Sequence, residues 1–193
     1  MKKSPSVPVL GAILLIICIA IAASVSLVHQ ITSPVIAESA ESSKKTSFKD
    51  VFPNAADFKD VTAEFPDRDT RISEIHEVQG QDGIIGYLYI VSTVGYADQV
   101  KNLVAIDQET QTVKSITILK QNETPSLGAK ATEPEFEDQF KGLPMNQDVT
   151  IIKGPGNVET SEVQSITAST ITSTAVALGV NLVLADYAKN FGN

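Results

Sequence analysis

The first 50 residues contain an unbroken apolar run followed by a polar stretch. The run Val7–Val28 reads VPVLGAILLIICIAIAASVSLV and holds no charged side chain. A helix of about 22 residues is roughly 33 Å long, which is enough to cross a hydrocarbon core of about 30 Å. The run therefore predicts a single transmembrane helix that contacts membrane lipid through residues 7–28.

Three other structures can produce such a run, and each fits this sequence less well. A cleaved signal peptide has an apolar core of only about 7–15 residues, although Ala22–Ser24 offers small residues for cleavage. A lipoprotein needs a small residue before Cys18, where the sequence has Ile17. A helix that is apolar on every side is difficult to bury in a chain of 193 residues. We therefore predict a retained anchor, and Lys2 and Lys3 before it predict a cytoplasmic N-terminus by the positive-inside rule.

The polar stretch after the anchor predicts a membrane-proximal stalk. Thr32–Lys49 is rich in Ser, Ala, Lys and Glu and is expected to be partly helical. The aromatic residues of Phe48–Phe58 predict a short helix that packs against a folded domain. The predicted division is a cytoplasmic N-terminus with a transmembrane anchor (1–30), the stalk (31–47) and one folded domain (48–193).

The folded domain shows the short apolar segments that are typical of strands. Ile84–Val91, IIGYLYIV, is β-branched and aromatic and predicts a strand that is buried on at least one face. Turn sequences at Gln79–Gly83 and Gln108–Gln111 separate neighbouring strands. The other predicted strands are Ile72–Val78, Leu103–Asp107, Thr112–Leu119 and Val149–Ile152.

Helical periodicity dominates the end of the chain. One apolar stripe at helical spacing is formed by Val176, Val180, Val183, Leu184, Tyr187 and Phe191. Glu133–Phe140, with Pro134 near its first turn, predicts a further short helix. The predicted fold class is α+β, with one N-terminal transmembrane helix followed by a domain that has an antiparallel sheet and a C-terminal helix.

Charge and composition exclude several classes of function. The net charge of −8 and the pI of about 4.7 disfavour binding to a phosphate backbone, so no nucleic-acid partner is expected. A single cysteine excludes an internal disulfide and a Cys-rich metal site. His29 and His76 are far apart, so no metal site is predicted. No Gly-rich dinucleotide motif and no cluster cysteines appear, so the chain is not expected to bind NADH or ferredoxin itself.

Three segments offer candidate chemistry. Ser165–Ser173, SITASTITS, precedes the C-terminal helix, where unpaired N–H groups and hydroxyls could hold a phosphate or simply cap the helix. Gln121–Lys130, QNETPSLGAK, follows a strand and could be a binding loop or a plain turn. Gly95–Tyr96 lies in a connecting loop, where the ring could stack on a flat ligand or be partly buried.

Two of these segments resemble motifs of a known family. Glu123–Lys130, ETPSLGAK, resembles the ETPGLG-type motif of the FMN-binding domain in the G subunit of the Rnf complex. Thr167–Val176, TASTITSTAV, resembles the SGAT-x-TS flavinylation motif of the same family. The domain also occurs in the C subunit of the sodium-pumping NADH:quinone oxidoreductase. The resemblance extends from the anchor to the last helix. The length of the chain suits the Rnf subunit better than the C subunit of the quinone reductase, which is usually longer.

The resemblance implies a cofactor and its site. In this family the final threonine of SGAT carries FMN through a phosphoester bond made by a separate flavin transferase, so covalent FMN is expected at Thr170. The other expected FMN-site residues are Thr167, Ala168, Ser169, Thr172, Ser173, Glu123, Thr124, Leu127, Gly128 and Tyr96. Ala168 and Ser126 stand where the family motifs have glycine, Ser169 replaces an alanine, and Gln164 stands where an acidic residue is common.

The resemblance also implies a function and a location. The chain is expected to be an electron-relay flavoprotein subunit of a membrane complex that couples ferredoxin:NAD⁺ electron transfer to ion translocation. Its partners would be the other membrane subunits, and its FMN domain would lie on the extracytoplasmic side of the bacterial inner membrane. The alternatives are the C subunit of a sodium-pumping quinone reductase, an anchored domain that binds FMN non-covalently outside any pump, and an anchored interaction domain without cofactor.

Overall fold

The N-terminal part of the chain is a long helix. The computed structural model describes residues 7–81 and 83–192, which divide into two units after Thr46. Helix α1 (Val7–Val51) is continuous, and an 18-residue window within it has a mean hydropathy of 2.8 with none of it buried. The stalk, expected to be partly helical, is helical throughout, Pro34 included. Lys2 and Lys3 lie outside the described residues, so the predicted membrane orientation stays a prediction.

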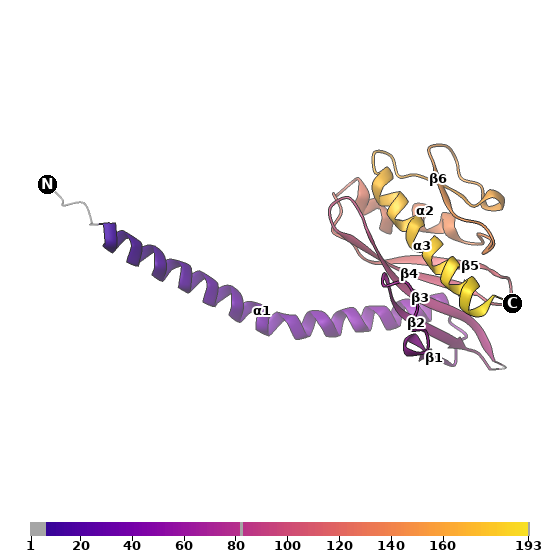
Figure 1. Cartoon of the computed structure of the whole chain (residues 1–193), viewed down its shortest axis with the longest axis horizontal. Helices are drawn as coiled ribbons and strands as arrows, with labels where there is room; N and C mark the ends of the chain where they lie inside the picture. The colour runs from indigo at the N-terminus through magenta and orange to yellow at the C-terminus, as the bar shows by residue number, and fades with distance from the viewer. Residues whose placement is uncertain (1–6, 82, 193) are drawn as a thin grey trace. The chain divides into compact units, whose positions relative to one another are not determined.

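The second unit, Ser47–Asn193, is built on an antiparallel sheet. Its strands follow the order β1-β2-β3-β4-β5, so each strand pairs with the one before it in the chain (Figure 1). The strands are β1 (Asp57–Asp60), β2 (Ile72–Gln79), β3 (Ile84–Val94), β4 (Gln99–Asp107) and β5 (Thr112–Lys120). The predicted α+β class and antiparallel sheet are confirmed. Strand β1 was not predicted, and β3 and β4 are longer than predicted because they continue to the short loop at residues 95–98.

Shorter elements and the last helix follow the sheet in the chain. They are the 3-10 helix η2 (Gly128–Thr132), α2 (Pro134–Glu137), the 3-10 helix η3 (Asp138–Phe140), β6 (Thr150–Ile152), the 3-10 helix η4 (Val158–Thr160), β7 (Glu162–Gln164) and α3 (Thr170–Phe191). A further 3-10 turn, η1 (Thr62–Glu64), lies between β1 and β2. Strands β6 and β7 form a separate parallel pair, and β7 was not predicted.

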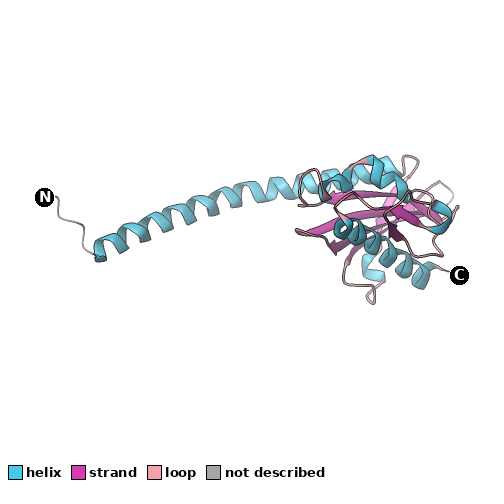
Figure 2. Ribbon diagram, turned by 90° about the horizontal axis from the view of Figure 1, so that it is seen from above, coloured by secondary structure: helices cyan, strands magenta, loops and turns pink. Residues whose placement is uncertain are grey.

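Helix α3 covers one face of the sheet (Figures 1 and 2). Alternate residues of β3 point to opposite faces, so Tyr89 and Val91 join the core under α3, whereas Leu88 and Ile90 face the other way. Among the described residues, two helices are long and apolar enough to cross a membrane, α1 and α3. The apolar stripe of α3, however, is buried against the sheet, with Val176, Val180 and Val183 fully buried. Helix α3 is therefore the core helix of this domain, as its periodicity predicted.

The last turn of α1 covers the opposite face of the sheet. Phe48 lies in the helix and Phe52 directly follows it, with its N–H bonded to the Phe48 carbonyl at 3.0 Å. Both side chains are buried in a second apolar cluster with Leu88 and Ile90. Gly86 makes room for this packing, because a Cβ atom there would lie 2.5 Å from the Phe52 ring. The sequence thus fills both faces of the central strands.

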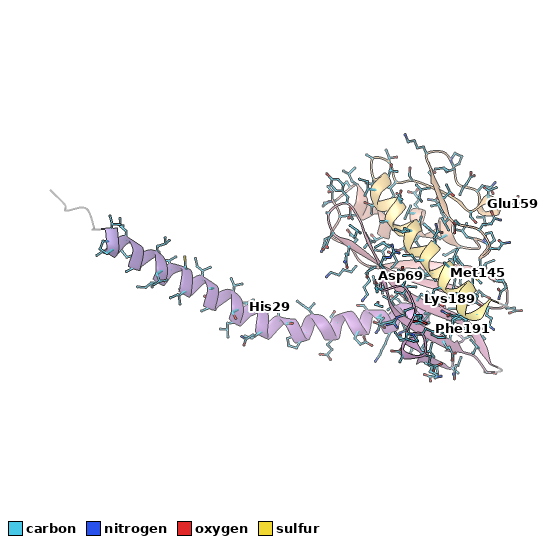
Figure 3. All side chains as sticks on the ribbon, in the orientation of Figure 1. His29, Asp69, Met145, Glu159, Lys189 and Phe191 are labelled. Atoms are coloured by element: carbon cyan, nitrogen blue, oxygen red, sulfur yellow. The ribbon has the colours of Figure 1, made fainter. Side chains whose placement is uncertain are left out.

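The C-terminal end of α3 is fixed by aromatic and polar contacts. Figure 3 labels Lys189 and Phe191 there; Phe191 packs on Phe65 with ring centroids 5.0 Å apart, and Lys189 Nζ donates to the Asp67 carbonyl at 3.2 Å. Asp186 is buried in the same region and accepts a hydrogen bond from Asn190 Nδ2 at 3.0 Å. Burial raises the pKa of Asp186 despite this bond and the nearby Lys189 and Arg68.

The raised pKa of Asp186 predicts a pH-dependent stability. The folded state holds the Asp186 proton more tightly than the unfolded state, so this group lowers stability progressively as pH rises from about 4. The Asp186→Asn variant should melt at a higher temperature than the wild type at pH 7, and the difference should shrink at pH 4. Thermal melts followed by circular dichroism test this, with the exposed Asp148→Asn as the matched control. A gain that is equal at both pH values would contradict the assignment.

Candidate functional site

Three chain segments meet at one end of the strands of the sheet. Val94, the last residue of β3, pairs with Gln99, the first residue of β4. Lys120, the last residue of β5, pairs with Lys101 of β4, so β5 ends on the same side of the sheet as β3. The 95–98 loop and the ETPSLG segment that follows β5 therefore leave the sheet together. The start of α3 reaches these two segments, because the helix packs along β3 and β4.

A cavity of about 530 Å³ lies between the three segments. It is lined by Tyr96, Glu123, Thr124, Leu127, Gly128, Ala168, Ser169, Thr170, Ile171 and Thr172. Among the predicted site residues, only Thr167 and Ser173 do not line it. Thr167 lines a neighbouring cavity, also of about 530 Å³, and Leu127 and Ala168 belong to both cavities. Ile171 was not predicted as a site residue. The sequence could have indicated it only because it is apolar and lies outside the apolar stripe of α3.

Glu123 joins the other two segments through its carboxylate. Its Oε1 atom accepts from the backbone N–H groups of Tyr96 at 2.9 Å and Ala97 at 3.0 Å. Its Oε2 atom accepts from the Thr172 hydroxyl at 2.8 Å. The side chain is buried, with 6% of the residue exposed. A buried carboxylate needs such donors to replace water, so this arrangement is self-consistent.

A second polar link joins the loop to the segment after β5. Asn122 Nδ2 donates to Asp98 Oδ2 at 2.7 Å. This bond and one from the backbone N–H of Gln99 hold the pKa of Asp98 below its usual range. The 95–98 loop is thus tied to residues 122 and 123 at two points.

The hydroxyls at the start of α3 divide into buried and free groups. Ser173 is fully buried, and its Oγ accepts from the Ile166 N–H and donates to the Ser169 carbonyl, both at 3.0 Å. Thr172 is 1% exposed and its hydroxyl is engaged by Glu123. Thr170, in contrast, is exposed, and within residues 7–81 and 83–192 its hydroxyl makes no hydrogen bond. Thr170 is therefore the free hydroxyl of the first turn.

The first turn of α3 also keeps unused N–H donors. Ser169 occupies the N-cap position but its side chain makes no capping hydrogen bond. The first intrahelical bond runs from the Ser173 N–H to the Ser169 carbonyl, so the N–H groups of residues 170–172 have no acceptor within the helix. These donors and the positive end of the helix dipole favour an anion at this position.

The two positions where the family motifs have glycine are both in the left-handed backbone region. Ala168 has φ +60° and Ser126 has φ +63°. Glycine adopts this region without steric cost, whereas a residue with a Cβ atom is strained there. The chain thus keeps the backbone path that glycine favours without having the glycines.

Other parts of the surface offer weaker candidates. A larger cavity, of about 690 Å³, lies at the opposite ends of the same strands and is lined by the β2–β3 and β4–β5 turns and by Phe52. It contains none of the predicted site residues. No group of three or more His, Cys, Asp or Glu side chains that could hold a metal ion occurs in the described part of the chain. The cavity beside Thr170 is therefore the candidate site.

These observations define the domain as an α+β ligand-binding module with a cofactor-sized cavity at the N-terminus of its last helix. Residues 95–185, which contain all three cavity segments, match the profile of the FMN-binding domain family. The chain is 33% identical over 188 residues to the G subunit of the Na⁺-translocating ferredoxin:NAD⁺ oxidoreductase complex of Acetobacterium woodii, covering 92% of this chain and 90% of the relative. It is also 33% identical to the G subunit of the ion-translocating oxidoreductase complex of Methanosarcina acetivorans, covering 69% of each chain. The chain therefore belongs to the FMN-binding domain family of Rnf-type G subunits, and the resemblance is confirmed.

More distant relatives share the domain. The chain is 30% identical to the C subunit of the Na⁺-translocating NADH-quinone reductase of Vibrio alginolyticus, covering 61% of this chain and 48% of the relative. The solved structure of the corresponding C subunit from Parabacteroides distasonis superposes with a TM-score of 0.52 at 24% identity, covering 60% of this chain and 61% of that chain. NqrC from Shewanella oneidensis gives a TM-score of 0.50 at 17% identity, covering 57% and 54%. These likenesses confirm the fold.

Restoring glycine at the two left-handed positions should stabilise the domain. Ala168→Gly and Ser126→Gly should each raise the free energy of unfolding by about 0.5–1 kcal/mol, because each relieves a positive φ. Ala185→Gly, on the exposed face of α3, is the matched control and should lower stability by about 1 kcal/mol. Chemical denaturation measures all three. A loss of stability in both motif variants would contradict the strained conformations.

Proposed function

We propose that this chain is the FMN-carrying electron-transfer G subunit of an ion-translocating ferredoxin:NAD⁺ oxidoreductase complex. The observation that carries the proposal is that three separate segments of an FMN-binding family member line one cavity beside a free hydroxyl at a helix N-terminus. FMN, when bound, supplies the redox chemistry. The residues of this chain bind it, orient it and limit its access to water.

The cavity suits both ends of FMN. Its volume of about 530 Å³ lies within the usual range for cofactor sites. The unused N–H groups of residues 170–172 are donors for a phosphate. Tyr96, Leu127 and Ile171 are large side chains that are 71%, 39% and 56% exposed. They line the same cavity, so they offer apolar surface for the isoalloxazine ring.

Thr170 is the proposed point of covalent attachment. A phosphoester needs a hydroxyl that an external flavin transferase can reach, and Thr170 is exposed and unbonded in the described chain. Thr172 and Ser173 are buried and hydrogen-bonded. Ser169 lines the same cavity but is buried, and Thr167 lines the neighbouring cavity. The pattern of exposure thus supports the register that the sequence motif implies. Covalent attachment would prevent the loss of FMN outside the cytoplasm.

The proposed location follows from the apolar helix. The run Val7–Val28 of α1 would cross the membrane and contact lipid, with the N-terminus in the cytoplasm and the FMN domain on the extracytoplasmic side. Other membrane subunits of the complex would be the electron-transfer partners. Relatives of this kind are subunits of ion-translocating complexes, which supports this assignment.

Coverage favours the G subunit of an Rnf-type complex over the C subunit of the NADH-quinone reductase. The alignment with the Acetobacterium woodii relative covers 90% of that protein, whereas alignments with C subunits cover 43–48% of theirs. This chain accordingly accounts for almost all of that G subunit and less than half of those C subunits.

Loss of the Thr170 hydroxyl should abolish covalent FMN. We expect the full-length chain, co-expressed with a flavin transferase, to give a fluorescent band on a denaturing gel. Thr170→Val keeps the side-chain shape but removes the hydroxyl, so its band should be lost. Thr170→Ser keeps a hydroxyl and should retain a band.

Other results on the gel would contradict attachment at Thr170, covalent linkage or FMN binding, each in a different way. A band that persists in Thr170→Val places the phosphoester on a neighbouring hydroxyl, and mass spectrometry of peptides would locate it. A wild-type band that is missing, with flavin released by denaturant, supports non-covalent FMN. A colourless wild-type protein supports an interaction domain without cofactor.

A further inference from the structure

Glu123 is the buried charged side chain at the centre of the proposed site. The family motif gives a reason to expect it near FMN, but its two carboxylate oxygens already accept from three protein donors. Two donors belong to the 95–98 loop, which carries Tyr96 and is called the Tyr96 loop below, and one belongs to the first turn of α3. A carboxylate with its oxygens engaged in this way is better suited to hold protein segments than to bind a ligand.

We propose that Glu123 is a positioning residue, which fixes the distance between the Tyr96 loop and the N-terminus of α3 without itself binding FMN. The inference rests on the proposed FMN function, since it deepens the account of that same cavity. Tyr96 lies on one of the joined segments and Thr170 on the other. The Glu123 bridge would therefore set where a flat group can lie relative to the attachment hydroxyl.

Two glycines support this role by an independent argument. A Cβ atom at Gly128 would lie 2.7 Å from Glu123 Oε2 and 2.7 Å from the Thr172 hydroxyl. A Cβ atom at Gly95 would collide with Glu123 Oε1. Neither glycine has a positive φ, so neither is needed for its backbone angle. Both are needed for space around the carboxylate, so residues of two segments are fitted to this one side chain.

The conservative variant separates hydrogen bonding from charge. In Glu123→Gln, the amide oxygen can still accept from the Tyr96 and Ala97 N–H groups, and the amide nitrogen can donate to the Thr172 hydroxyl. The bridge is therefore kept while the negative charge is removed. Glu123→Ala removes the bridge altogether. Glu159→Ala, at an exposed glutamate of η4 that does not line the cavity, is the control for the loss of a glutamate side chain.

The first measurement needs no flavin. Hydrogen exchange of the full-length chain, followed by mass spectrometry on peptides from residues 92–100, reports the amides of Tyr96 and Ala97. Exchange there should be about tenfold faster in Glu123→Ala than in the wild type, because both amides lose their acceptor. Glu123→Gln and Glu159→Ala should exchange at the wild-type rate.

The second measurement reports how attached flavin is held. After co-expression with a flavin transferase, the visible circular dichroism of the flavin should be weakened or lost in Glu123→Ala, and kept in Glu123→Gln and Glu159→Ala. A far-UV melt confirms that each variant is folded. If Glu123→Ala does not fold, Gly128→Ala replaces it, since its Cβ atom would displace the same carboxylate.

The outcomes separate this inference from the proposed function. Wild-type exchange rates and wild-type visible dichroism in a folded Glu123→Ala overturn the positioning role, whatever the gel shows. Loss of the visible dichroism in Glu123→Gln as well as in Glu123→Ala also overturns it, because the charge and not the bridge would then matter. A missing wild-type flavin band refutes covalent FMN, while the exchange measurement still decides whether Glu123 holds the loop.

Discussion

The packing of α3 across the sheet is the constraint on which the candidate site depends. Burial of Val176, Val180 and Val183 contributes roughly 1.5–3 kcal/mol for each side chain, so the helix cannot slide without a large loss. The Thr93 hydroxyl donates to the Ala175 carbonyl at 2.8 Å, and Gly179 lies against Val91. These contacts fix the position of the helix along the strands. They also place its first turn beside the ends of β3 and β5.

The same helix geometry decides which hydroxyl is available. Thr172 and Ser173 lie four and three residues before Val176, so they continue its buried face into the first turn. Their hydroxyls are buried and must be hydrogen-bonded, and both find protein partners. Thr170 lies outside this buried face and remains exposed. A run of chemically similar residues is thus sorted by the helix period into supporting and accessible groups.

Much of this fold could be predicted from the sequence, because its long elements have clear periods. The central strands and the apolar stripe of α3 were predicted. Strands β1 (DFKD) and β7 (EVQ) were missed because they are short and each has a single apolar residue, whereas the equally short β6 (TII) is β-branched throughout. Helix α3 begins at Thr170, although its stripe was recognised only from Val176. Ser and Thr are weak helix formers, and only tertiary burial shows that they continue the stripe. The candidate site was predicted less completely, because the bridge between Glu123 and Thr172 joins positions 49 residues apart, and a single sequence has no local signal for such a contact.

Two of the four departures from the family motifs, Ala168 and Ser126, concern backbone shape. Ala168 and Ser126 keep the positive φ angles that glycine would adopt, so the surrounding packing holds the loop and the helix start in the strained conformation. The cost of about 1 kcal/mol at each position is small beside the burial of α3. The residues with the proposed roles, Thr170 as the attachment hydroxyl and Glu123 as the bridge between segments, are unchanged. The two segments therefore keep the backbone angles that glycine favours and the two residues of the proposed site, although their sequences differ from the family motifs.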